Sequence, residues 1–137
     1  MKKAKLLLLP LIASSLCSCY MRSSHYNSIM MISENRNESC RLTFDFFEGN
    51  YVFKMKKTSP GEGTVSYRVT LGTGKADVTY SIESIAGNQK ETLLCTVTSG
   101  ETLEGTFGYV EKGYKVFINV ISDGKIEKGD FQFQMNK

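Results

Sequence analysis

Apolar and polar residues alternate along most of the chain from Cys40 to its end. Thr43, for example, separates Leu42 from Phe44, and the same period of two recurs through the later segments. This period places alternate side chains on opposite faces of a β-strand, so each run predicts a strand with one buried and one solvated face. No segment has a convincing helical period. We therefore predict an all-β domain.

The breaks between these runs set the number and order of the strands. Segments rich in Gly, Pro, Asn and Asp recur about every 12 residues, which predicts about eight strands. Glu48-Gly49-Asn50 is predicted to turn the chain, and Ser122-Asp123-Gly124-Lys125 contains the Asp-Gly pair typical of a β-hairpin. Because the connections are short, we expect antiparallel strands in a meander that forms a small barrel or, alternatively, a β-sandwich.

The first 18 residues have a different character. Three lysines precede an apolar run from Leu6 to Leu16, which is the pattern of a secretory signal peptide. The run contains Pro10 and is shorter than the roughly 20 apolar residues that cross a bilayer. Residues 1–18 hold three of the 17 basic residues and none of the 14 acidic ones, so the remainder of the chain is neutral.

The signal segment ends in Leu16-Cys17-Ser18-Cys19, which resembles the lipobox of bacterial lipoproteins. The resemblance covers about the first twenty residues and implies cleavage before Cys19 and lipidation of its thiol. Cys17 departs from the family pattern, in which a small Ala or Ser is usual. Two or more acyl chains anchor a protein stably, so the diacylglyceryl group of this family would suffice. Because Tyr20 is not the Asp that retains lipoproteins in the inner membrane, we expect the outer membrane or the outer face of the cell membrane.

Residues 19–39 are predicted to form a tether, and residues 40–137 the β-domain. Ser, Asn, Arg and Glu dominate the tether segment, which lacks a sustained helical or strand period. The apolar run Ile29-Met30-Met31-Ile32 interrupts it. This run is either part of the tether, a first strand, or a single helical turn packed on the domain.

Cys40 and Cys95 form an even pair in the predicted mature chain. An exported protein can form disulfides, so we expect these two residues to be bridged. The alternative is a pair of buried free thiols.

Catalytic and metal chemistry are not expected. His25 is the only histidine, and it lies in the predicted tether, away from a scaffold that could hold it beside a nucleophile. His and Cys do not cluster at metal-ligand spacing. Gly72-Thr73-Gly74-Lys75 is followed by a predicted strand, whereas a phosphate-binding loop requires a helix there. We therefore expect a non-enzyme without a cofactor, and the neutral mature chain disfavours nucleic acid as a partner.

The aromatic residues on the predicted strands have two interpretations. They are spaced as the inward residues of a packed core, or they line a ligand cavity of the kind that an eight-stranded barrel can enclose. The residues that would line such a cavity are Phe44, Phe53, Tyr67, Tyr80, Tyr114, Phe131 and Phe133. Phe47, Phe117 and Ile121 instead fall on nominally polar faces, where exposed apolar groups would indicate a partner surface.

Three functions fit these patterns. The first is a non-catalytic envelope lipoprotein that binds a protein partner or a ligand at the cell surface. The second is a carrier of a small apolar ligand, because the domain resembles the calycin and lipocalin barrels by architecture alone, although it has no Trp for the lipocalin signature. The third is an inhibitor of a cell-wall-degrading enzyme, because Ser99-Gly100-Glu101-Thr102 resembles the inhibitory loop of periplasmic lysozyme inhibitors, with Leu103 in place of its Tyr.

Overall fold

The computed structural model describes residues 23–88 and 90–136, and the regular structure among them is β-strand throughout. The predicted all-β class is confirmed. The predicted signal segment and Cys19 lie outside the described residues. The strands are β1 (His25–Ile29), β2 (Ile32–Asn35), β3 (Ser39–Lys56), β4 (Gly63–Thr73), β5 (Lys75–Ser84), β6 (Gly87–Asn88), β7 (Thr92–Thr98), β8 (Thr102–Val110) and β9 (Lys115–Met135).

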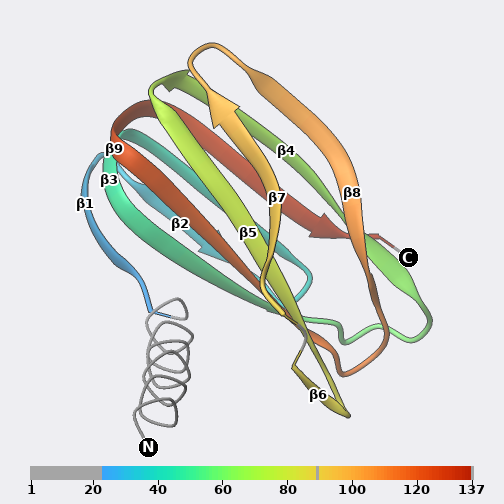
Figure 1. Cartoon of the computed structure of the whole chain (residues 1–137). Coiled ribbons are helices and arrows are strands. Elements are labelled where there is room, and N and C mark those ends of the chain that lie inside the picture. The colour runs from blue at the N-terminus through green and yellow to red at the C-terminus, as the bar shows by residue number, and fades with distance from the viewer. Residues whose placement is uncertain (1–22, 89, 137) are drawn as a thin grey trace, which may run out of the picture.

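The strand pairing joins these elements into a few long, bent strands (Figure 1). β9 pairs antiparallel with β3 along almost the whole length of both. On the opposite edge of β9, β4 pairs with its second half and β5 with its first half. β8 and β7 then pair with β4 and β5 in the same succession. β4–β5 and β7–β8 therefore each follow the course of one long strand.

Glycines mark the level at which the long strands bend. Gly49 in β3, Gly74 between β4 and β5, and Gly124 in β9 all have a positive φ, which Gly adopts without a side-chain penalty. A Cβ on Gly74 would lie 2.6 Å from Cγ2 of Ile126 on β9. The close approach of β9 is therefore a second reason for glycine at position 74. The bends lie together at the upper end of Figure 1, where β9, β4–β5 and β7–β8 all reverse direction.

The bends fold the sheet into two facing layers. The first layer contains β2, β4, β8 and the halves of β3 and β9 that pair with each other at residues 39–48 and 125–134. The second contains β5, β7 and the remaining halves of β3 and β9. The rings of Tyr80 and Phe107, which come from different layers, have centroids 4.4 Å apart. The apolar faces of the two layers therefore form one shared core.

The predicted order and two predicted turns are wrong. β9 lies between β3 and β4, so consecutive strands are not simple neighbours. Glu48 pairs with Lys125 and Asn50 with Ile121, so the predicted turn and the predicted hairpin are two sides of one irregularity in a continuous ladder. Glycine allows a bulge as well as a turn, which explains the misassignment. The sheet ends at β1 and β2 on one side and at β7 and β8 on the other, so it is open and matches the sandwich alternative rather than a closed barrel.

The alternation of buried and exposed residues in β3 changes phase just before this irregularity. Phe44 and Phe47 are both buried, although they are three residues apart, and their ring centroids are 5.2 Å apart. Phe47 therefore belongs to the core and not to the predicted partner surface. Phe117 and Ile121 are half-buried.

The folded domain begins before Cys40. β1 and β2 occupy residues 25–35, within the segment predicted as a tether, and both pair with β3. The run from Ile29 to Ile32 is neither a single strand nor a helical turn, because Ile29 ends β1, Ile32 begins β2, and Met30 and Met31 connect them. Met31 packs against the core, so this part of the chain is integral to the domain.

We expect Gly74→Ala to lower the free energy of unfolding by about 2–4 kcal/mol, because it adds a backbone penalty at φ 108° to a steric overlap with Ile126 and the Lys125 carbonyl. Gly61→Ala is the matched control, since Gly61 also has a positive φ but has no neighbouring atom within 4 Å of the point where a Cβ would lie. Its expected loss is about 1–2 kcal/mol. Urea unfolding measures both, and equal losses would show that the bend does not require the space.

Candidate functional site

A row of polar side chains crosses the outer face of the first layer. Register places Glu34 of β2, Arg41 of β3, Gln132 of β9, Arg68 of β4 and Glu104 of β8 side by side on five adjacent strands. Side chains alternate between the faces of a strand, so these residues point away from the core that their neighbours build. We call these five residues the polar row. Its charges run from a carboxylate through two guanidinium groups, with an amide between them, to a second carboxylate.

The polar row lies in a shallow groove of about 480 Å³. The strand β9 forms the middle of the groove, between the two arginines, because it pairs with β3 on one side and β4 on the other. The groove is lined by the polar row and by Ser39, Cys40, Ser66, Tyr67, Phe133 and Gln134. Polar groups from all five strands of the first layer therefore face the same space.

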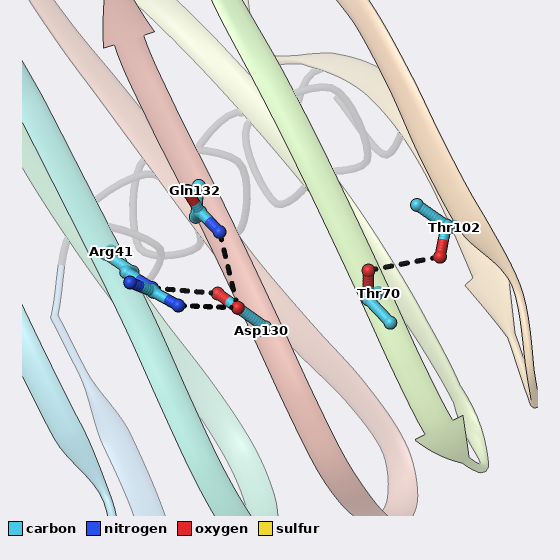
Figure 2. Close-up of polar contacts among 5 residues, drawn as sticks. All are labelled: Arg41, Thr70, Thr102, Asp130 and Gln132. Atoms are coloured by element: carbon cyan, nitrogen blue, oxygen red, sulfur yellow. Dashed lines mark hydrogen bonds and ion pairs between the residues drawn. The ribbon is translucent and has the colours of Figure 1, made fainter.

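Arg41 is held in a fixed orientation by Asp130 on the neighbouring strand. Its Nε donates to Oδ1 at 3.1 Å and its Nη2 donates to Oδ2 at 2.8 Å, which makes a two-pronged ion pair (Figure 2). Gln132 Nε2 donates to the same Oδ2 at 3.3 Å. The hydrogen bonds and charge of Asp130 raise the pKa of Arg41 above its ordinary value. A guanidinium has five N–H donors, so three remain to face the groove.

Arg68 is more loosely held. Its Nε lies 3.0 Å from Oε1 of Glu104, but the two side chains are 59% and 66% exposed. An ion pair that is so open to water stabilises a fold weakly and can exchange for a ligand at little cost. On the adjacent row, the hydroxyls of Thr70 and Thr102 lie 3.2 Å apart (Figure 2). The groove therefore combines one rigid cation with one adaptable cation.

A second polar cluster lies between β3 and the loop that follows it. Lys57 is 1% exposed, and its Nζ donates to the Oγ and carbonyl of Ser59 at 2.8 and 2.9 Å. Ser59 Oγ in turn donates to Glu38 Oε2 at 2.6 Å, and this bond is the main reason that the pKa of Glu38 is lowered. Lys57 donates to Ser59 and Ser59 donates to Glu38, so the hydrogen bonds of the cluster tie the segment before β3 to the loop after it as a structural clamp.

The structure places the aromatic residues that were candidates for a cavity lining in the interior. Phe44, Phe53, Phe131 and Phe133 are at most 4% exposed. Their rings pack in pairs. The ring centroids of Phe53 and Phe133 are 5.8 Å apart, and those of Phe44 and Phe131 are 6.1 Å apart. Tyr67, Tyr80 and Tyr114 pack against the same cluster from partly buried positions. These contacts are those of a filled core.

The predicted disulfide is not formed, and Cys40 and Cys95 are free thiols. Cys40 lies on β3 and Cys95 on β7, strands that do not pair. The two thiols therefore do not face each other across neighbouring strands of one ladder.

The residues compared with the lysozyme-inhibitor loop have local partners in the turn between β7 and β8. Ser99 Oγ accepts from the Gly74 amide at 2.8 Å, and Glu101 Oε1 accepts from the Thr98 amide at 2.8 Å. The hydrogen bonds from Thr98 lower the pKa of Glu101. Both side chains therefore stabilise the bend at which β7 passes into β8.

Sequence reasoning did not single out the polar row. Each member lies on the polar side of an alternating strand, where solvated surface is the ordinary interpretation. The arrangement arises from register between strands that are up to about 90 residues apart in the chain, as between Arg41 and Asp130. Opposite charges at matching positions of two paired strands are the only available signal, and they require the pairing to be known.

Residues 23–88 and 90–136 contain no group of three or more His, Cys, Asp and Glu residues that could hold a metal ion. Within the same ranges, no helix is long and apolar enough to cross a membrane.

The chain matches no protein-family model and no curated protein sequence. Among solved structures it is similar to a family 6 carbohydrate-binding module from Clostridium cellulolyticum in complex with xylose, with 17% identity, a TM-score of 0.42, and 81% of this chain and 90% of that chain covered. It is also similar to TmCBM61 in complex with β-1,4-galactotriose, with 12% identity, a TM-score of 0.43, and 85% of this chain and 90% of that chain covered. A third similar structure is the Drosophila melanogaster CENP-C cupin domain, with 8% identity, a TM-score of 0.33, and 83% of this chain and 76% of that chain covered. All three TM-scores lie below 0.5.

The two thiols should differ in reactivity. Burial raises the pKa of Cys40, while burial and the charge of Asp77 raise that of Cys95 to about 11. Only half-buried Cys95 should react with a disulfide reagent in the native protein, about tenfold faster for each pH unit between 8 and 10 as its thiolate fraction rises. In a Cys17→Ser/Cys19→Ser chain, colorimetric titration should count two thiols after unfolding, and Cys95→Ser should remove the native reaction. A count of zero would show that the bridge forms.

Proposed function

We propose that this chain is a lipid-anchored, non-catalytic binding protein of the bacterial cell envelope. The groove that contains the polar row is its ligand site. The lipobox-like Leu16-Cys17-Ser18-Cys19 supports the anchor, and the alignment of Glu34, Arg41, Gln132, Arg68 and Glu104 across five strands supports the site. The protein is exported, anchored through Cys19, and held at the outer membrane or the outer face of the cell membrane.

The ligand class that fits the polar row is an oligosaccharide. A sugar hydroxyl donates and accepts hydrogen bonds at the same time, so a series of hydroxyls needs acceptors and donors in close succession. The polar row offers them in order: a carboxylate accepts, a guanidinium donates, the Gln132 amide does both, and the sequence then reverses. Ser39 and Ser66 add hydroxyl groups along the same groove. A small apolar ligand is less suited to this surface, and the aromatic interior is filled.

The role of the polar row is binding rather than hydrolysis. The guanidinium groups of Arg41 and Arg68 offer hydrogen-bond donors and no acceptor, which suits them to holding a ligand and not to general-base catalysis. Glu104, a carboxylate of the groove lining, is paired with Arg68, and Asp130 on the adjacent row accepts from Arg41 and Gln132. The groove can therefore orient a ligand through fixed hydrogen bonds while leaving its covalent bonds unchanged.

We expect Arg68→Ala to weaken oligosaccharide binding at least about tenfold, because it removes a charge-assisted donor. Gln132→Ala should have a similar effect. Lys54→Ala is the control, since Lys54 is also an exposed strand residue but pairs within the second layer, at Phe117. A glycan array identifies the ligand, and calorimetric titration compares the variants. Unchanged affinity in Arg68→Ala and Gln132→Ala, or no bound glycan, would contradict the proposed site.

The anchor is tested separately. Cys19→Ala should move the protein from the membrane fraction to the soluble fraction, because the acyl chains on this cysteine supply the stable anchor. Cys95→Ala is the matched control and should remain in the membrane fraction. Retention of Cys19→Ala at the membrane would contradict lipidation at this residue.

A further inference from the structure

An exposed apolar kink interrupts the first strand of the sheet. Ile29, Met30 and Ile32 are 59%, 73% and 64% exposed, whereas Met31 between them packs against the core. β1 ends at Ile29 and β2 begins at Ile32, and both pair with β3 on either side of the kink. We call Ile29, Met30 and Ile32 the apolar kink. Single exposed apolar residues are ordinary, but three around one kink form a patch.

The backbone conformation favours exposure of this patch. Met30 has a φ of 55°, a region that residues with a Cβ occupy at a cost of roughly 1–2 kcal/mol. The kink turns Met31 toward the core and leaves Met30 as the most exposed large apolar residue on this strand. A strained backbone that exposes apolar surface has no benefit for the isolated domain, which indicates that the surface has a partner.

The position of the predicted anchor identifies that partner. This step rests on the proposed function, in which Cys19 carries the lipid. Only residues 20–22 separate Cys19 from the first described residue, Ser23. Four peptide steps span at most about 14 Å, and a five-residue strand such as β1 is about 17 Å long. The apolar kink, one strand length farther along, therefore lies within reach of the same bilayer.

We propose that the apolar kink is a membrane-contact surface that seats the β1–β2 edge of the sheet in the interfacial region of the anchoring bilayer. Tyr26, 40% exposed on β1 and stacked on Phe47, suits the same region because it has an apolar ring and a polar tip. With this edge at the membrane, the polar row runs outward from Glu34 on β2 to Glu104 on β8. The ligand groove then stands away from the lipid and open to its surroundings.

The test uses the full lipidated protein in vesicles of phosphatidylethanolamine and phosphatidylglycerol. Met30→Cys in a Cys95→Ser background carries an environment-sensitive fluorophore, and nitroxide groups on the lipid act as quenchers. Leu93→Cys is the matched control, because Leu93 is 58% exposed on β7, away from the β1–β2 edge. We expect quenching at position 30 to exceed that at position 93 by at least about twofold. The proposed contact places position 30 about 5–10 Å into the interfacial region, where the nitroxide groups can reach it, and leaves position 93 in water. Ile29→Ser/Ile32→Ser should reduce quenching at position 30 without releasing the protein.

Mass spectrometry of the peptide that contains Cys19 determines whether the anchor is present. A lipidated protein with equal quenching at positions 30 and 93 overturns the membrane-contact surface and leaves the proposed anchor intact. A protein without lipid on Cys19 overturns both. Crosslinking of position 30 to position 30 of a second copy, without quenching by lipid, assigns the kink to an edge-to-edge dimer and also overturns the proposal.

Discussion

The bend shared by the long strands is the constraint on which the rest of the architecture depends. β3, β9 and β4–β5 lie side by side, so they can change direction only at the same level. The bend occurs at three glycines with a positive φ, Gly49, Gly124 and Gly74. A side chain on Gly49 would collide with the carbonyl oxygen of His25 at 2.1 Å, so the bend fits the first strand tightly as well. The two layers, their common core and the outward face that bears the groove all follow from this fold of one sheet.

The groove depends on the same continuity. Because β3 and β9 keep one register from Ser39 to Glu48, Arg41 lies opposite Gln132 and two residues from the level of Asp130 on the adjacent strand, within reach of its carboxylate. The rigid backbone allows a two-pronged ion pair to form across the ladder with little loss of side-chain freedom. A shift of one residue in the register would move the arginine to the core face, so the arrangement of the site and the burial of Leu42 are one structural requirement.

The local sequence pattern was sufficient to predict which face of most strands is buried, but it was insufficient to predict which strands pair. The alternation around Leu42, Phe44 and Val69 predicts buried residues that the structure also buries. The pair Asp123-Gly124 is compatible with a hairpin and with a bulge, and only the neighbouring strand decides between them. Phe47 was predicted to be exposed and is buried in the structure. The alternation in β3 changes phase just before the bulge at Glu48 and Asn50, and local pattern does not show this change. The polar row was beyond local pattern altogether, since it is assembled by pairing between distant segments.

The place of β9 in the sheet also determines when the domain can fold. It is the last strand of the chain, yet it lies between β3 and both β4 and β5 and pairs with all three. A chain that is still being synthesised and has not reached Lys115 has no strand to join its earlier segments, and its central contacts are all long-range. The central pairing of the sheet can therefore form only after β9, and slow folding is expected for a sheet dominated by non-local pairing. Until β9 is available, β3, β4 and β5 therefore lack the strand that each of them pairs with in the centre of the sheet.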